Sequence, residues 1–117
     1  MRQYYKPMLG TPATEPFTSR DWIFEIKWDG IRAISYVDAE VSIKSRNGKE
    51  LIGKFPELEE LGNIARNTVL DGEIIVMKDK RTDFQAILER SKAPSKRDAQ
   101  YMAKISPATY VIFDILE

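Results

Sequence analysis

Apolar side chains that alternate with polar ones between short turn signals constrain this fold more than any other feature of the sequence. The period of two predicts strands at three early segments: residues 22–27 (WIFEIK), 32–37 and 41–45. Asp29-Gly30 predicts a turn or bulge after the first strand, and a hairpin is expected between the other two. Asn47-Gly48 is the strongest short turn signal in the chain.

The second half of the chain mixes helix and strand signals. Pro56 opens a predicted helix over residues 56–67 (PELEELGNIARN), and Asp83 is a predicted N-cap for the helix FQAILERSK. Apolar runs predict strands at residues 68–77 and 110–116. Residues 1–21 are expected to form an extended lead-in, because prolines interrupt them. This order of elements predicts a single α+β domain with a mainly antiparallel sheet and flanking helices.

The composition excludes several kinds of chemistry. The 117 residues contain no histidine and no cysteine, so Ser-His-Asp and Cys-His triads, His/Cys zinc sites and disulfides are ruled out. The formal net charge is zero, so only a local cluster of cations could attract nucleic acid. No apolar run approaches the roughly 20 residues that a membrane span needs. We therefore expect a soluble, cytoplasmic protein that does not bind membranes.

Lys27 stands in an apolar segment where an aliphatic residue would be the ordinary choice. Taken alone, such a lysine is most simply an edge residue whose ammonium reaches water. The alternative is a nucleophile, which attacks only as the neutral amine, a form that burial and a neighbouring cation such as Arg32 favour. Asp29 could orient the amine, and Gly30 would let a ligand or another backbone approach closely. The combination favours a chemical role over an edge charge.

The stretch FEIKWDGIRA, residues 24–33, resembles the Lys-x-Asp-Gly-x-Arg motif of ATP-dependent DNA ligases, related RNA ligases and mRNA capping enzymes. Three later stretches are similar to family motifs in the same order: SRNGKEL (45–51), LDGEIIV (70–76) and YVIFDIL (110–116). The segments between these motifs, among them KFPEL and DFQAILERS, are similar to the ligase module of end-joining ligases of the ligase D type. The resemblance implies a partial nucleotidyltransferase (ATP-grasp-like) adenylation domain.

The resemblance also implies roles for individual residues. Lys27 would attack the α-phosphate of ATP to give lysyl-AMP, and Glu25 would accept a hydrogen bond from the adenine amino group. Arg32 would hold the ribose or a phosphate, and Ile26 would belong to the same nucleotide pocket. Arg46 would contact the nucleotide's phosphates or the 5′-phosphate of a DNA nick. An arginine beside a turn can equally be an exposed surface charge.

Two more residues complete the implied site. Glu73 would bind a ribose hydroxyl or a metal ion, Mg²⁺ or Mn²⁺. Phe113 would stack on adenine, although a phenylalanine in an apolar strand is ordinarily a core residue. Trp22 and Trp28 are assigned to packing. The acidic residues Glu57, Glu59 and Glu60 are interpreted as a solvated helix face.

The implied partner is nicked double-stranded DNA with a 5′-phosphate and a 3′-hydroxyl, joined in repair or replication, with end-joining repair proteins as further partners. Later family motifs and the OB-fold domain have no counterpart in these residues. We therefore expect residues 1–117 to be the N-terminal portion of a ligase adenylation domain. Two alternatives stay open. One is a nucleotide-binding or accessory module without turnover, and the other is a related RNA ligase or GTP-dependent capping nucleotidyltransferase.

Overall fold

A five-stranded sheet forms the centre of the computed structural model, which describes residues 3–117. The strands are β1 (Ile31–Val37), β2 (Val41–Ser45), β3 (Thr68–Lys78), β4 (Arg81–Thr82) and β5 (Ala108–Ile115). All pairings are antiparallel, in the order β2-β1-β3-β4, and β5 also pairs with β3. The expected α+β architecture with an antiparallel sheet is confirmed.

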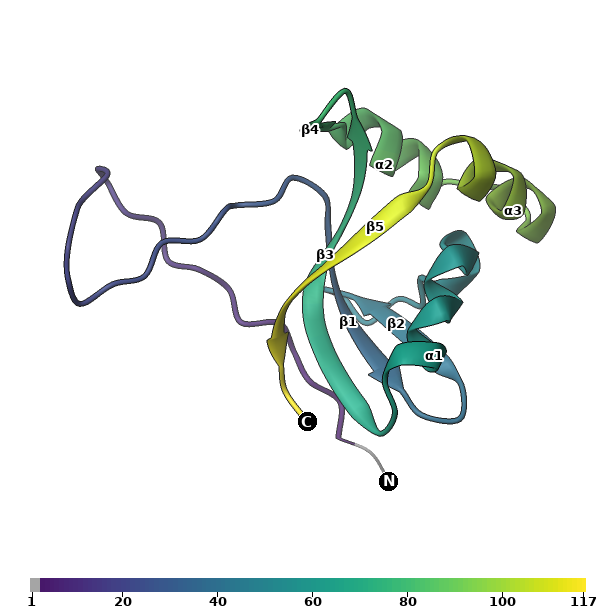
Figure 1. The fold of residues 1–117 in the computed structure, drawn as a ribbon, viewed down its shortest axis with the longest axis horizontal. Coiled ribbons are helices and arrows are strands. Elements are labelled where there is room, and N and C mark those ends of the chain that lie inside the picture. Colours follow the sequence, from purple (N-terminus) through teal and green to yellow (C-terminus); the bar gives the residue numbers. More distant parts are fainter. Residues whose placement is uncertain (1–2) are drawn as a thin grey trace.

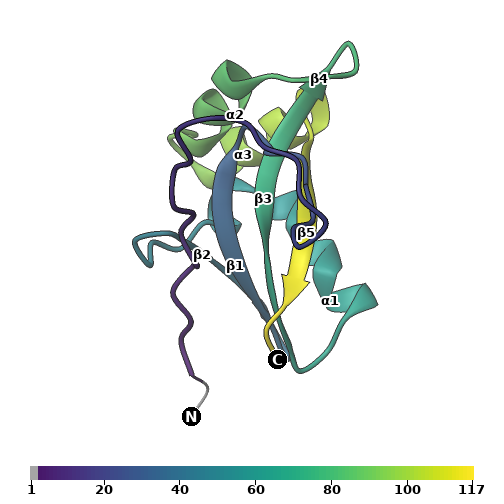
Figure 2. The ribbon, with the colours of Figure 1, turned by 90° about the vertical axis from the view of Figure 1, so that its left-hand side faces the viewer.

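The helices cover one face of this sheet (Figures 1 and 2). They are the 3₁₀ helices η1 (Ile52–Lys54) and η2 (Pro56–Glu60), followed by α1 (Leu61–Ile64), α2 (Phe84–Ser91) and α3 (Lys96–Ile105). Asp83 caps α2 as predicted, accepting a hydrogen bond from the Ala86 backbone N–H at 3.0 Å. The helix predicted over 56–67 is instead a 3₁₀ helix that passes into a single α-helical turn. None of the helices in the described residues is long and apolar enough to cross a membrane.

The main core lies between the helices and the sheet. Strand alternation points Ala33 and Val37 of β1, and Ile74 and Val76 of β3, toward the helices, where Phe55 is fully buried. A smaller apolar cluster, Ile34, Tyr36 and Val69, lies on the opposite face of the sheet. Because the helices do not cover that face, it is the one on which polar side chains can gather.

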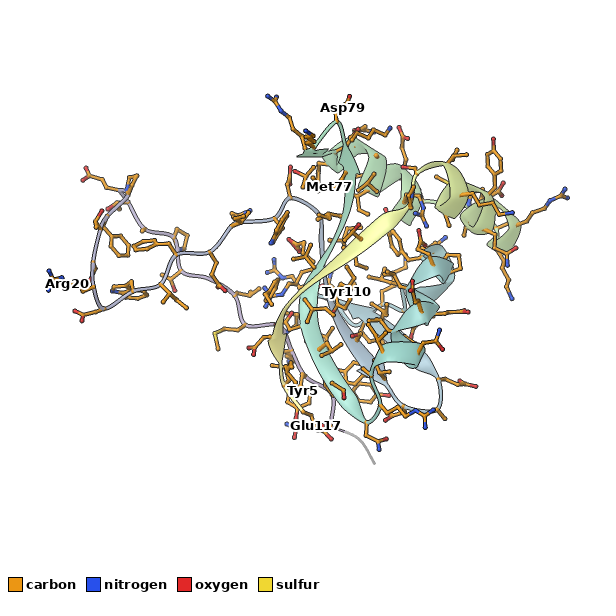
Figure 3. All side chains as sticks on the ribbon, viewed as in Figure 1. Tyr5, Arg20, Met77, Asp79, Tyr110 and Glu117 are labelled. Carbon is orange, nitrogen blue, oxygen red and sulfur yellow. The ribbon has the colours of Figure 1, made fainter. Side chains whose placement is uncertain are left out.

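Residues 3–30 contain no strand or helix, and much of this segment projects from the sheet as a long loop with Arg20 at its tip (Figures 1 and 3). The first two residues of the expected lead-in lie outside the described residues. The strand predicted at 22–27 is wrong. Both alternating sets of side chains are exposed there, with Ile23 at 86% and Phe24 at 62%. A period of two yields a strand only when a neighbouring strand supplies hydrogen bonds, and no described strand lies beside this segment.

The projecting loop has aromatic contacts of its own. The Phe17 ring meets Trp22 and Phe24 edge-on, with centroid distances of 5.7 and 5.6 Å. Trp22 thus packs against another side chain as expected, but at 64% exposure it lies outside the core. Trp28 is half-buried and lines a cavity described below.

A buried ion pair joins the helical layer. The Arg90 side chain is fully buried, and its guanidinium donates two hydrogen bonds to Glu57, at 2.6 and 2.8 Å. It also donates to the carbonyl oxygens of Ser106 at 2.7 Å and Lys54 at 3.1 Å. Glu57 in turn accepts from the backbone N–H of Ala108 at 3.0 Å. Glu57 is therefore a structural partner, and its interpretation as part of a solvated face is wrong.

Candidate functional site

A cavity of about 900 Å³ brings together seven of the residues that the sequence singled out for chemistry or nucleotide binding, while Asp29 does not line it. The projecting loop contributes three of them: Glu25, Ile26 and Lys27. The sheet and its β2 turn contribute the other four: Arg32, Arg46, Glu73 and Phe113. The rest of the lining comes from residues that the sequence did not assign to a site: Leu9, Gly10, Trp28, Val111 and Ile112. Residues far apart in the chain therefore surround one space.

Strand alternation explains why the sheet residues share this cavity. Arg32 lies opposite Glu73 in the β1–β3 register, and Glu73 lies opposite Val111 in the β3–β5 register. Their chain neighbours Ala33 and Ile74 pack into the core on the helical side. Because successive side chains of a strand point to opposite faces, Arg32 and Glu73 point away from the helices.

Arg32 is held rigidly by Asp71. Its Nε lies 2.7 Å from Oδ1 of Asp71, and its Nη2 lies 2.7 Å from Oδ2. Asp71 is only 4% exposed, and these hydrogen bonds raise the pKa of the Arg32 guanidinium above its ordinary value. The guanidinium carbon lies 4.9 Å from the centroid of the Phe113 ring, within cation–π range. Arg32 is thus fixed before any ligand arrives, with Asp71 as its positioning residue.

A β-bulge sets the place of Phe113. The β3–β5 register pairs Asp71 with Asp114 but pairs Gly72 with Ile112, so Phe113 has no partner across the ladder. Bulges turn a side chain out of the regular alternation and are common beside functional sites. The Phe113 ring is 42% exposed beside Arg32, so its ordinary interpretation as a core phenylalanine is wrong.

Gly72 lets β5 come close at this bulge. A Cβ atom at position 72 would overlap the carbonyl oxygen of Val111 and would lie 2.7 Å from the Tyr110 ring. Tyr110, labelled in Figure 3, has its hydroxyl oxygen 2.9 Å from the Ala33 carbonyl oxygen and 3.1 Å from that of Leu70. Burial raises the pKa of Tyr110 to about 12, so it stays a neutral donor. The bulge is therefore supported by close backbone packing and by a hydroxyl that ties β5 to the sheet.

Glu73 is half-buried in the cavity. Desolvation raises the pKa of its carboxyl, and the positive charges of Arg32 and Lys27 oppose that rise. A carboxylate so placed can accept hydrogen bonds from hydroxyl groups, or it can provide one oxygen ligand to a cation.

Lys27 lies on the projecting loop, and its side chain is exposed at the cavity. The burial expected around it is not provided by residues 3–117, and no strand holds Asp29 and Lys27 on a common face. Gly30 anchors the loop where β1 begins. A Cβ atom there would overlap the carbonyl oxygen of Ile74. The close approach predicted at Gly30 is thus to the backbone of β3.

Arg46 is carried by a tight turn after β2. The turn is closed by the Gly48 N–H bond to the Ser45 carbonyl oxygen at 2.8 Å and the Ser45 N–H bond to the Lys49 carbonyl oxygen at 2.8 Å. Gly48 has φ of +80°, a conformation that favours glycine, so the predicted Asn47-Gly48 turn is confirmed. The exposed Arg46 side chain therefore projects from a well-defined backbone.

The described residues do not supply enough side-chain ligands to bind a metal ion without a bound nucleotide. No group of three or more Asp, Glu, His or Cys side chains in residues 3–117 could hold one. Mg²⁺ is commonly bound by one or two carboxylates together with substrate phosphates, so Glu73 is compatible with such a shared site but does not form one alone.

Comparison with known proteins identifies the family. Residues 7–117 match the sequence model of the ATP dependent DNA ligase domain, so the chain belongs to this family. It is 38% identical, over 97% of its length, to the SPbeta prophage-derived DNA ligase-like protein LigB of Bacillus subtilis. It is 34% identical, over 94% of its length, to DNA ligase C of Mycobacterium tuberculosis. The relatives' names thus point to DNA ligases, as the motifs implied.

The fold agrees with this assignment. A solved structure of mycobacterial DNA ligase D complexed with ATP and MES superposes with a TM-score of 0.54 and 26% identity, over 80% of this chain and 28% of that one. The chain spans 39% of the LigB protein and 31% of DNA ligase C. It therefore corresponds to a portion of these larger proteins.

Proposed function

We propose that this chain forms the N-terminal portion of the adenylation domain of an ATP-dependent DNA ligase, with Lys27 as its nucleophile. The observation that carries the proposal is the convergence of Lys27, Arg32, Glu73 and Phe113 on one cavity. Membership of the ligase domain family supports ATP as the nucleotide.

The reaction forms and breaks one bond to phosphorus at each step. The neutral amine of Lys27 attacks the α-phosphorus of ATP, a P–N bond forms, and pyrophosphate leaves with the electrons of the broken P–O bond. A 5′-phosphate oxygen of nicked DNA then attacks the same phosphorus, and the P–N bond breaks to return the amine. Finally the 3′-hydroxyl attacks the activated 5′-phosphate and AMP leaves, so that the strand is sealed.

The cavity residues have separate parts in this scheme. Phe113 stacks on the adenine ring, Glu25 accepts from its amino group, and Ile26 adds apolar contact. Arg32, already fixed by Asp71, binds the ribose or a phosphate without a further loss of side-chain freedom.

The remaining groups serve the ribose and the phosphates. Glu73 accepts from a ribose hydroxyl or holds a metal, and Arg46 neutralises phosphate charge. A bound Mg²⁺ or Mn²⁺ would supply further neutralisation of the phosphates.

The proposed macromolecular substrate is nicked duplex DNA, joined during repair or replication in the cytoplasm. Relatives include the multifunctional non-homologous end joining protein LigD of Mycolicibacterium smegmatis, 33% identical over 96% of this chain. End-joining proteins are for that reason the proposed partners.

Transfer of label from ATP tests the proposal directly. The chain is incubated with ATP labelled at the α-phosphate and with magnesium, and acid-labile label on the protein is measured. We expect label on the unaltered chain and none on Lys27→Ala. Lys92→Ala, which removes an exposed lysine that does not line the cavity, should keep the label. Equal labelling of the Lys27→Ala variant refutes the assignment, and so does absence of label on the unaltered chain even after the C-terminal part of the domain is joined to it.

The same assay separates the nucleotidyltransferase classes. Label from GTP in place of ATP would indicate a capping-type enzyme. Transfer of AMP to a nicked RNA, but not to a nicked DNA, would indicate an RNA ligase. We expect ATP and DNA in both cases.

A further inference from the structure

A groove of about 380 Å³ lies between β5 and the helical segment of η2 and α1, and Figure 2 shows α1 beside β5. We call it the α1–β5 groove. Its apolar lining includes Leu58 and Leu61, which are buried, and Ile64 and Ile112, which are 73% and 38% exposed. Ile112 also lines the 900 Å³ cavity, whereas the other groove residues do not. The volume falls within the usual range of binding pockets, about 300–1,000 Å³.

The outer edge of β5 borders this groove and is open. Among residues 3–117, β5 pairs only with β3. The backbone N–H of Ala108 points to the outer edge, where it donates to Glu57 at 3.0 Å. Backbone groups of an antiparallel strand alternate between its two edges, so those of Tyr110 and Ile112 point the same way as those of Ala108. An extended segment laid in the groove can therefore hydrogen-bond to them.

Both ends of the open edge are protected against pairing. Pro107 precedes the strand, and Glu57 already accepts from the N–H of Ala108. At the other end, the bulge at Phe113 interrupts the ladder. Prolines, charges and bulges are the usual means by which sheets block unwanted pairing at an edge. Residues 109–112 (TYVI) carry no proline and no charge, so the open stretch fits a short extended segment better than the edge of another sheet.

The charge of the groove limits the kind of segment that it fits. No lysine or arginine of the described residues lines it. The Glu57 carboxylate is paired with Arg90, whereas Glu60 is exposed and forms no ion pair among residues 3–117. A second copy of the chain would bring the same carboxylate toward itself. A segment that carries a cation is complementary to Glu60.

We propose that the α1–β5 groove binds an extended, basic segment of a partner protein as an additional strand of the sheet. The segment's backbone pairs with Tyr110 and Ile112, its alternate apolar side chains cover Ile64, and a lysine or arginine meets Glu60. In this mode of recognition, main-chain hydrogen bonds provide affinity and the pockets for alternate side chains provide specificity. The proposal goes beyond the ligase function and does not depend on the role of Lys27.

A synthetic peptide tests the strand addition. The probe is a fluorescent eight-residue peptide in which valine alternates with threonine and one terminal residue is lysine, and its binding is measured by fluorescence anisotropy. We expect saturable binding, and none by the same peptide with every backbone N–H methylated, because that peptide cannot donate to a strand edge. Equal binding by the two peptides, or no saturable binding up to about 1 mM, overturns the proposal.

The apolar contact has a matched pair of variants. Ile64→Ser should weaken peptide binding about tenfold, because the peptide no longer covers an aliphatic side chain there. Ile105→Ser is the control, since Ile105 is 63% exposed on α3 and does not line the groove. Both positions are exposed, so both variants should keep the circular dichroism spectrum of the unaltered chain. Equal affinities for Ile64→Ser and Ile105→Ser overturn the assignment to this groove.

A charge reversal tests the basic residue of the segment. Glu60→Lys should prefer a peptide with glutamate in place of its lysine, the opposite of the unaltered chain. Glu59→Lys is the control, because Glu59 is exposed but does not line the groove, and it should keep the preference for lysine. An unchanged preference in Glu60→Lys overturns the contact with Glu60.

Two other occupants of the groove give distinct results. A dimer of the unaltered chain in analytical ultracentrifugation that Ile64→Ser abolishes would assign the groove to a second copy. Loss of peptide binding when the C-terminal part of the domain is joined to the chain would assign the groove to later residues of the same protein. Either result overturns the partner segment. A monomer that binds the peptide in both the short and the joined form supports it.

Discussion

Replacement of Arg90 by methionine should destabilise the fold more than any surface change. The variant fills a similar volume but leaves the Glu57 carboxylate without its two hydrogen bonds, and it leaves two carbonyl oxygens unpaired. Removing one partner of a buried ion pair costs roughly 3–5 kcal/mol. The Glu57 side chain keeps 21% exposure, so water recovers part of its solvation. We therefore expect a loss of about 3 kcal/mol, the low end of that range.

Urea unfolding followed by far-UV circular dichroism measures this loss. With a slope of about 1–3 kcal/mol per molar urea, the midpoint should fall by roughly 1–3 M. Arg97→Met, on the exposed surface of α3, is the matched control and should change stability by no more than about 0.5 kcal/mol. A midpoint for Arg90→Met that falls no further than that of Arg97→Met would refute the reasoning.

A second variant separates lost packing from an unpaired charge. Glu57→Gln in the Arg90→Met background removes the isolated charge, while the amide oxygen can still accept from the Ala108 N–H. We expect it to recover about 1–2 kcal/mol. No recovery would mean that the loss comes from packing against Phe55, whose ring centroid lies 5.1 Å from the Arg90 guanidinium carbon.

Three further variants or conditions test smaller features. Gly30→Ala should cost about 1–3 kcal/mol in urea unfolding, because its Cβ would overlap a β3 carbonyl, whereas Gly10→Ala, with open space around it, should be nearly neutral. Asp83→Ala should cost about 1 kcal/mol through loss of the α2 cap. Burial raises the pKa of Glu50, but hydrogen bonds from Lys44 and other donors outweigh it and lower the pKa to about 2. Because the folded pKa lies below the ordinary value of 4.5, the stabilisation is full above about pH 5 and is lost as the pH falls toward 2, so Glu50→Gln should flatten the acid part of a stability–pH curve.

Each of these expectations has a contrary result. Equal urea midpoints for Gly30→Ala and Gly10→Ala would mean that the start of β1 can shift without a loss of stability. An unchanged midpoint for Asp83→Ala would mean that packing alone holds α2. An acid limb that is identical with and without Glu50→Gln would assign the acid sensitivity to other carboxylates.

Local signals in the sequence were good predictors of local structure. Asp83 caps α2 and Asn47-Gly48 turns the chain after β2, because each depends on hydrogen bonds within a few residues. The strand predicted at 22–27 failed for the opposite reason. Its hydrophobic pattern was present, but a strand also needs a neighbour, and periodicity does not report on neighbours.

The site was predictable as a set of residues and not as an arrangement. The ligase-like motifs named seven residues that line one cavity, and the roles implied for them stay predictions. The Arg32–Asp71 ion pair was not predicted, because its members are 39 residues apart and meet only through the β1–β3 register. The bulge at Phe113 was not predicted either, since it depends on how β5 passes Gly72. The sequence did not predict the burial of Arg90, because this residue lies in a segment with the pattern of an ordinary amphipathic helix.

Arg46 lines the cavity described above and also a neighbouring cavity of about 640 Å³, so one guanidinium faces two spaces. An anion held on one side of such a group would weaken the attraction felt by an anion on the other side. Linkage makes this coupling reciprocal, so each anion would lower the affinity for the other by the same factor. In the proposed reaction, the nucleotide that is left after pyrophosphate departs carries less negative charge than ATP, and it would therefore compete less for Arg46.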